Sequence, residues 1–356
     1  MNTGYCYSFP AVRGIQAGRP FYIATCPLRI IPRIFVFDEE EVPADLRAQR
    51  TLNKSRIPEM MRYLLDNPKD YVFSAITASV GSDVNFLDNE NTPNMGTLEI
   101  PLDAQILIND GQHRRKAIEQ AIKENPDLGQ DNIAVLFFID EGLQRSQQMF
   151  ADLNKYAVKP SASLSTLYDQ RDPASELARY LAQEIAPFKG LTELEKSNIS
   201  SVSGKLFTLS GIKQATKALL GKGAKDSYSS HDREMAIEYW TEVYKHTPEW
   251  QMVEKKQLAA AEARREFVIA HGLGLHALGI FGRALILQHP DKWKEQLTDL
   301  TKVDWRKSNP EFQKRSLLHG KLSKAQTNIT LTANYLKILL NQPLTPEEKL
   351  IETKIQ

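Results

Sequence analysis

The sequence predicts an α+β protein in which an N-terminal α+β domain is followed by an all-helical C-terminal domain. Two observations predict this order. Segments rich in Ile, Val and Phe alternate with helical patterns as far as about residue 159, and strand-like segments are absent after that point. The change falls at VKPSASLS, around Pro160, so the expected domains are residues 1–160 and 161–356.

In the first domain, four apolar segments bounded by Pro, Asp, Asn or Gly are expected to be strands. They cover residues 29–37, 71–80, 98–108 and 133–139. Three helices are expected between and after them, over residues 55–65, 111–123 and 143–156. The first has Ser55 as a candidate N-cap and Pro58 in its first turn, where a missing N–H is harmless.

The second domain is expected to contain helices over residues 174–186, 211–220, 232–246, 259–288 and 327–341. Residues 268–287 are apolar enough to suggest a membrane span. They include His271, His276 and Arg283, which are costly in lipid, so a buried core helix is expected instead. The first twenty residues do not resemble a secretory signal. We therefore expect a cytoplasmic protein without a membrane partner.

Composition excludes a strongly basic nucleic-acid binder, because 45 Lys and Arg residues balance 44 Asp and Glu residues. Any DNA site must be a local patch. The two cysteines are too few for a disulfide scaffold or a cysteine zinc site, and no metal site is expected. Cys26 has Arg29 nearby, which could lower its thiol pKa and make it redox-sensitive. The alternative is a buried structural thiol.

The most informative segment is ILINDGQHRRKAIEQA, residues 106–121. A strand is expected to end at Asn109, followed by a sharp turn at Gly111 and a helix with Ala117, Ile118 and Ala121 on its inner face. This places the N–H groups of Gly111, Gln112 and His113 at a helix N-terminus, with the side chains of His113, Arg114 and Arg115 around it. Such an arrangement favours an anion, with phosphate as the natural candidate.

Plain helix capping is the alternative for this segment. Asp110 would then be the N-cap, and His113, Arg114 and Arg115 would be solvated first-turn residues. On either interpretation the two arginines lie off the expected inner face, so replacing either one is expected to cost little stability.

Asp110 to Arg114, DGQHR, resembles the signature of DGQHR-domain proteins, and the chain resembles the DndB family of DNA sulfur modification proteins over nearly its whole length. Three further segments have the character and order of that family: AVRGIQAGRPFYIATCPLR, QRTLNKSRIPEMMRYL and MFADLNKYAVKPSASL. More distantly, the first domain is similar to ParB and sulfiredoxin domains. The resemblance implies a ParB-like fold in which Gly111 to Arg115, Arg56 and Asn154 surround a phosphate. A sulfiredoxin-like thiol mechanism is not expected, because no cysteine lies between Gly111 and His113.

The family resemblance implies a regulatory role in DNA phosphorothioate modification, as a DNA-binding repressor of the modification genes. The implied partners are promoter DNA, other DNA sulfur modification proteins and a second copy of the chain. The competing hypothesis is a nucleotide-dependent enzyme, either a nucleoside triphosphate hydrolase or a DNA-processing enzyme. It would hold ATP or CTP with Mg²⁺ at the motif, and Asp110 or His113 would assist a metal or water.

Two locally basic runs, at residues 189–225 and 302–324, support DNA binding independently of the resemblance. The expected phosphate contacts are Lys205, Lys213, Lys217, Arg306, Lys307, Lys314, Arg315 and Lys321. The alternative is that these are the ordinary solvated basic faces of a helical domain.

Overall fold

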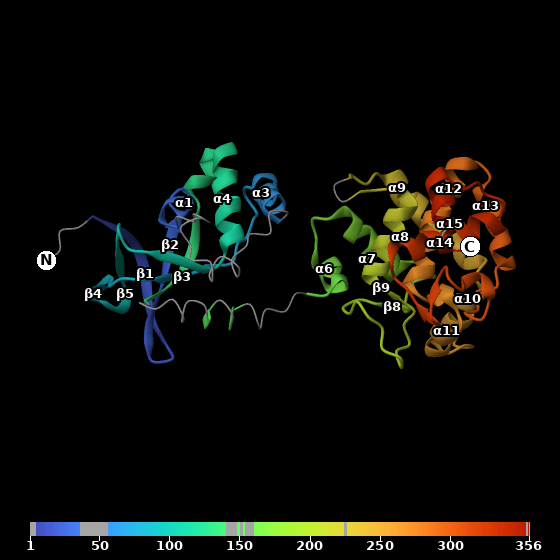
Figure 1. Ribbon diagram of the computed structural model, residues 1–356, viewed down its shortest axis with the longest axis horizontal. Helices are drawn as coiled ribbons and strands as arrows, with labels where there is room; N and C mark the ends of the chain where they lie inside the picture. The colour runs from blue at the N-terminus through green and yellow to red at the C-terminus, as the bar shows by residue number, and fades with distance from the viewer. Residues whose placement is uncertain are drawn as a thin grey trace. The chain divides into compact units, whose positions relative to one another are not determined.

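The computed structural model describes residues 5–35, 56–139, 148–149, 152–153, 160–223, 226–353 and 355. Contacts divide the chain into two units, Met1–Val158 and Lys159–Gln356 (Figure 1). The first unit contains a β-sheet with helices and the second is helical, which confirms the predicted α+β class. Within the described residues, no helix combines the length and the apolar character that crossing a membrane requires.

The sheet of the first unit has the strand order β4-β5-β1-β2-β7-β3-β6. The strands are β1 (Cys6–Gln16), β2 (Arg19–Pro27), β3 (Ile76–Val80), β4 (Asn85–Asn89), β5 (Thr92–Pro101), β6 (Ile106–Asp110) and β7 (Asn132–Ile139). Strands β3 and β7 are parallel, and the other neighbouring pairs are antiparallel. The last residue of the edge strand β6 is therefore the first residue of the DGQHR motif.

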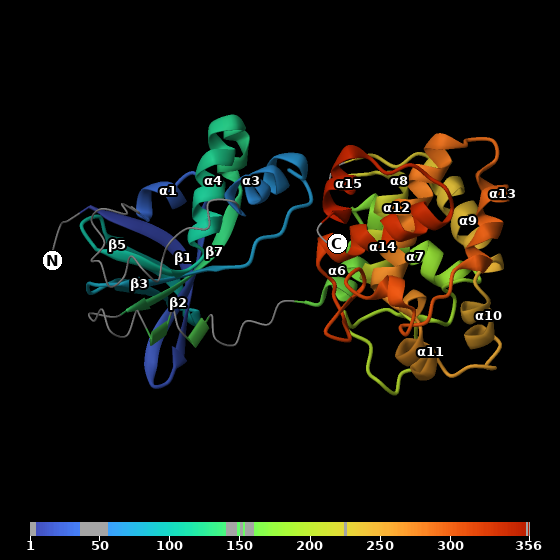
Figure 2. The same cartoon turned by 45° about the vertical axis from the view of Figure 1, so that its right-hand side comes forward.

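Helices α1 (Ile31–Ile34), α3 (Arg56–Asp66) and α4 (Gln112–Glu124) lie on the same side of this sheet (Figures 1 and 2). A 3₁₀ turn, η1 (Pro126–Gln130), follows α4. The side chains of Ala117, Ile118 and Ala121 on α4 are fully buried, as the sequence pattern predicts. The core between α4 and the sheet also contains Ile76 and Val135. This packing fixes the start of α4 against the ends of β3 and β6.

Three of the predicted strands are wrong in part. Residues 31–34 of the segment 29–37 form the short helix α1, with Pro32 in its first turn, and residues 36–37 lie outside the described part of the chain. The segment 98–108 is two strands, because a turn in which Ala104 N–H donates to Pro101 O at 3.1 Å separates β5 from β6. The segment 71–80 becomes a strand only at Ile76.

The hairpin of β1 and β2 is not among the predicted elements. Its turn uses Ala17 and Gly18, both with positive φ, as a two-residue hairpin turn of type I′ requires. The inward residues of the pair include Ala11, Ala24 and Cys26, which are small and give little apolar signal. The predicted cap Ser55 and most of the predicted helix 143–156 fall outside the described residues.

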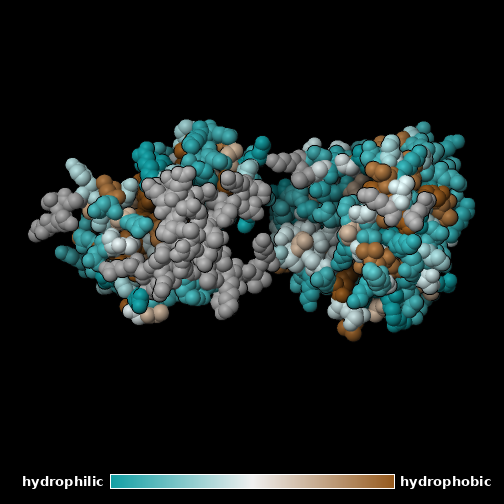
Figure 3. Space-filling view, viewed as in Figure 1, coloured by the Kyte–Doolittle hydropathy of each residue, from teal (hydrophilic) through white to brown (hydrophobic). Residues whose placement is uncertain are grey.

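The second unit is mainly helical, as predicted. It also contains short 3₁₀ turns and two small pairs of strands, which the prediction of an all-helical domain did not include. Its helices are α6 (Ala162–Tyr168), α7 (Pro173–Glu184), α8 (Leu209–Leu220), α9 (Ser230–Lys245), α10 (Pro248–Glu254), α11 (Ala260–Glu266), α12 (Gly272–Gln288), α13 (Trp293–Leu297), α14 (Gln326–Leu339) and α15 (Pro346–Glu352). The 3₁₀ turns are η2 (Val268–Ala270), η3 (Thr298–Lys302) and η4 (Pro310–Phe312). The pairs are β8 (Thr192–Glu193) with β9 (Phe207–Thr208), and β10 (Leu317–Leu318) with β11 (Lys321–Leu322). Hydrophilic residues cover most of the face of this unit seen in Figure 3, and hydrophobic residues form separate patches.

The single helix predicted for residues 259–288 is wrong, because it is broken into α11, η2 and α12. His271 is extended (φ −126°, ψ 156°), and Val268 N–H donates to Trp305 O at 2.9 Å instead of continuing a helix. The prediction that the apolar part is a core helix is confirmed by α12. A Cβ at Gly279 would lie 2.2 Å from Ala215 O on α8, so these two helices pack with their backbones close together.

Candidate functional site

The DGQHR motif forms the turn between β6 and α4. Asp110 is the last residue of β6, and Gly111 is the N-cap of α4, with φ 112° and ψ 13°. No side chain caps this helix, so the alternative in which Asp110 is the N-cap is wrong. The carboxylate of Asp110 instead accepts a hydrogen bond from Nη2 of Arg114, at 2.6 Å. The start of α4 is therefore left uncapped by side chains, which suits a helix end that binds an anion.

Glycine is required at position 111 for two reasons. Its positive φ is strained for other residues. In addition, a Cβ at this position would lie 3.0 Å from Cγ1 of Ile76 and 3.1 Å from Nη2 of Arg114. The guanidinium of Arg114 thus packs directly over the turn.

Arg114 is held against the end of β3. Its Nη2 also donates to Ala75 O at 3.0 Å, and the side chain is 14% exposed. Its Nε is buried and has no hydrogen-bond partner among the described residues. The guanidinium is therefore fixed in place while retaining an unused donor.

Arg115 points in a different direction, because consecutive residues of an α-helix are about 100° apart. Its Nε donates to Phe35 O at 3.0 Å and its Nη2 to Pro32 O at 2.9 Å, and Nη1 pairs with Glu119 at 2.5 Å. The residue is buried. The expectation that Arg115 is solvated and dispensable for stability is wrong, since it ties α1 to α4.

Gln112 is also turned inward. Its Nε2 donates to Ile108 O at 3.1 Å, and the side chain is buried. The backbone of Gln112 still belongs to the first turn of α4, whereas its side chain faces β6.

His113 lies between two arginines. Its pKa is lowered, mainly by burial and then by the positive charges of Arg56 and Arg114, while Asp110 opposes the shift. Arg56 is the first residue of α3, and α3 packs against α4. The fold thus brings Arg56 to the motif from a distant part of the sequence, as the family resemblance implies. Asn154, the last member of the predicted set, lies outside the described residues.

Arg56 and Arg114 line one pocket of about 400 Å³. The other lining residues are Glu59, Met60, Tyr63, Val72, Phe73 and Ser74. The rings of Tyr63 and Phe73 are stacked, with centroids 6.0 Å apart. The pocket therefore combines two guanidinium groups with an aromatic wall.

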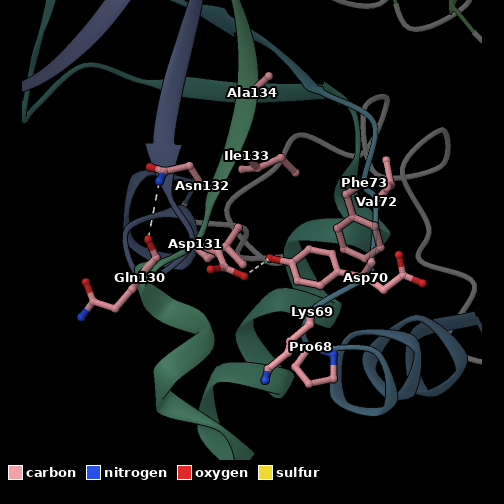
Figure 4. Close-up of a pocket in the computed structure, with 12 residues that line it drawn as sticks. Pro68, Lys69, Asp70, Val72, Phe73, Gln130, Asp131, Asn132, Ile133 and Ala134 are labelled. Carbon is pink, nitrogen blue, oxygen red and sulfur yellow. Dashed lines mark hydrogen bonds between the residues drawn. The ribbon is translucent and has the colours of Figure 1, made fainter.

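A neighbouring pocket of about 560 Å³ shares Val72 and Phe73 but contains none of the motif residues (Figure 4). Within it, Tyr71 Oη donates to Asp131 Oδ2 at 2.6 Å. Residues 71–74 precede β3 and line one or both pockets, with Val72 and Phe73 shared between them. The sequence pattern gives no sign of this role, because the aromatic and β-branched residues of the segment 71–80 are typical of a strand throughout.

Several of the predicted DNA contacts in the helical unit are engaged inside the unit. Lys213 pairs with Asp172 at 2.5 Å, and Arg315 pairs with Glu311 and Glu352. Lys205 donates to Gly190 O at 2.8 Å, and Lys307 donates to Arg264 O at 2.7 Å. Arg306, Lys314 and Lys321 are exposed, and Lys217 is half-buried. Of the three exposed residues, Lys314 also donates to Ile355 O at 3.3 Å.

Cys26 is fully buried in the sheet core. Burial raises the pKa of its thiol to about 12, so the lowering by Arg29 is wrong and the alternative, a buried structural thiol, is confirmed. Among the described residues, no group of three or more His, Cys, Asp or Glu side chains is arranged to hold a metal ion.

The fold and site define a class of protein with a basic strand-to-helix turn in a sheet unit, followed by a helical unit. The chain belongs to the DndB family, described as DNA-sulfur modification-associated, whose family model matches residues 9–343. Membership implies a role in the DNA sulfur modification system. No curated protein and no solved structure matches the chain. The similarity to ParB and sulfiredoxin domains therefore stays a prediction.

Proposed function

We propose that this protein is a DNA-binding regulator of the DNA phosphorothioate modification system, and that it represses the modification genes from the cytoplasm. Its DNA partner is the promoter region of those genes. In this proposal the pocket lined by Arg56 and Arg114 receives a backbone phosphate, which these two side chains contact. Exposed basic residues of the helical unit, among them Arg306, Lys314 and Lys321, add further phosphate contacts.

The observation that carries the proposal is the meeting of Arg56 with Arg114 at one pocket. Both lower the pKa of His113, so their positive charges act on the same small region. Asp110 compensates the charge of Arg114 through their ion pair, and Glu59 is the one carboxylate among the described residues that line the pocket. The two guanidinium groups offer planar, paired donors that suit a phosphate, and family membership makes the phosphates of DNA the relevant source.

The cleanest test replaces Arg56 by Ala. Arg56 is exposed, so its loss leaves the core unchanged, whereas Arg114 also stabilises the turn. Loss of one charge-assisted phosphate contact is expected to weaken binding to promoter DNA about tenfold or more, and to derepress a reporter. Arg62→Ala is the matched control, because Arg62 is exposed on the same helix but does not line the pocket. Equal DNA affinity for wild type and Arg56→Ala would contradict the proposal.

A nucleotide-dependent enzyme is the second candidate, favoured by the stacked Tyr63 and Phe73 beside the two arginines. A planar base against this wall, with its phosphates toward Arg56, would suit the pocket's chemistry. Titration with ATP and CTP, with and without Mg²⁺, distinguishes the two candidates. On the enzyme proposal, nucleotide binds wild type but not Arg56→Ala, and DNA binding changes only when nucleotide is present.

A further inference from the structure

The helical unit contains a second pocket, of about 430 Å³, that the proposed function does not use. Five parts of the unit form its wall. They are Ala162 at the start of α6, the loop of Ser197, Asn198 and Ile199, the segment from Leu206 to Gln214 at the start of α8, the segment from Arg264 to His276 around the start of α12, and Lys324 with Ile329 of α14. Elements distant in sequence therefore converge on one cavity.

The charged residues that line this pocket are Arg264 and Lys324, and no Asp or Glu is among the described residues that do. His271 and His276 also line it, and burial lowers the pKa of both imidazoles, which favours their neutral form. Lys307 adds another positive charge, because its Nζ donates to Arg264 O at 2.7 Å, the carbonyl that the ring of His271 also contacts. The pKa of His271 is lowered to about 4 by burial and by Lys307, Arg264 and Lys324. These contacts describe a half-buried, electropositive space.

Arg264 shapes this space rather than offering its own donors. Its Nη2 donates to the carbonyls of Ser200 and Ser201, at 2.9 and 3.1 Å, and Nη1 donates to that of Lys205. These bonds hold the loop that carries Ser197 and Asn198. Arg264 therefore contributes its positive charge while keeping one wall of the pocket in position.

Neutral donors complete the lining. Ser210 Oγ lies 3.0 Å from Ser163 Oγ, and Thr208 Oγ1 accepts from Gly211 N–H at 3.1 Å. The amides of Asn198 and Gln214 lie on the same lining. α12 begins here at Gly272 without a side-chain cap, and its partial positive charge adds to that of the basic residues. Positive charge, hydroxyl groups and amide donors together match the requirements of an oxyanion.

We propose that this pocket binds a phosphate-class oxyanion, with Lys324 and the hydroxyl and amide side chains as its contacts and Arg264 as a positioning residue. The site goes beyond the proposed function, since it lies in the helical unit and contains none of the motif residues. Its ligand is either a backbone phosphate of DNA or the phosphate of a free small molecule. The chemistry of recognition is the same for both sources.

The test titrates the full-length protein with inorganic phosphate and with pyrophosphate, followed by calorimetry and by the imidazole NMR signals of His271 and His276. Both signals are expected to shift on binding. Lys324→Glu is expected to weaken binding tenfold or more, because it replaces a donor by a repelling charge. Lys321→Ala is the control, since Lys321 is an exposed lysine nearby in sequence that does not line the pocket. The proposal is overturned if neither anion shifts these signals at millimolar concentration, or if Lys324→Glu binds as wild type does.

Competition with DNA identifies the source of the phosphate. If inorganic phosphate displaces duplex DNA and Lys324→Glu weakens DNA binding, the pocket receives a backbone phosphate. If phosphate binds without affecting DNA, the ligand is a free phosphate compound, and the proposed site stands in either case. Arg56→Ala should leave phosphate binding in this pocket unchanged, so a failure of the motif proposal is distinguishable from a failure of this one.

Discussion

Asp110 and Arg114, the first and last residues of the DGQHR motif, are joined by an ion pair of 2.6 Å across the turn between β6 and α4. The pair places the guanidinium of Arg114 over Gly111 and leaves the helix start uncapped by side chains. The motif is therefore a turn stabilised by an ion pair between two of its own residues. Ligand binding at the motif depends on residues from other elements that the fold brings close to it, above all Arg56.

Gly111→Ala is expected to destabilise the first unit by about 1–3 kcal/mol, because it places a Cβ against Ile76 and Arg114 at a positive φ. Gly81→Ala is the control, since a Cβ there meets nothing closer than 3.6 Å. The measurement is urea unfolding followed by far-UV circular dichroism. A midpoint for Gly111→Ala equal to that of Gly81→Ala would show that the turn is not constrained as described.

Arg115→Ala is expected to cost about 2–3 kcal/mol of stability, because the carbonyls of Pro32 and Phe35 lose a charged donor. Lys123→Ala provides the comparison, since Lys123 pairs with the same Glu119 at 3.1 Å but is 71% exposed. Its loss should cost less than about 1 kcal/mol. All four tryptophans lie in the helical unit, so tryptophan fluorescence should remain unchanged in both variants. Equal unfolding midpoints for the two variants would contradict the structural role assigned to Arg115.

Acid is expected to destabilise the helical unit through His271. Its folded-state pKa of about 4 lies below the ordinary value of 6.5, so the unfolded chain takes up the proton more readily. Stability should therefore be fully present above pH 6.5 and fall as the pH drops toward 4, by up to about 1.4 kcal/mol per pH unit. Tryptophan fluorescence during urea unfolding measures this dependence. His271→Gln should reduce the slope between pH 5 and 6.5, and an unchanged slope would assign the effect to other groups.

The sequence predicts the α4 side of the site well because local patterns determine it. The apolar spacing of Ala117, Ile118 and Ala121 predicts the buried face of α4, and Gly111 predicts the sharp turn. The directions of the two arginines are not predictable in this way. Arg114 is directed by Asp110 and by the carbonyl of Ala75. Arg115 is directed by α1, a short helix in a segment whose Ile and Phe residues are typical of a strand.

The basic runs of the helical unit show a second limit of sequence analysis. Lys213 has no acidic neighbour in its own run, but the fold places Asp172 at its ammonium group. Arg315 is likewise neutralised by Glu352 from α15. Counting charges along a segment cannot include carboxylates that only the fold supplies. The pocket at Lys324 was missed for the same reason, since its lining comes from five separate segments.

The dependence of DNA affinity on salt tests the central claim most directly, because the slope of log K against log salt counts phosphate contacts. Wild type should lose affinity steeply as salt rises. Arg56→Ala should reduce the magnitude of the slope by about one, and Arg62→Ala should leave it unchanged. If Arg56→Ala binds promoter DNA with the slope and affinity of wild type, the motif pocket does not contact DNA phosphate, and the account of the site is contradicted.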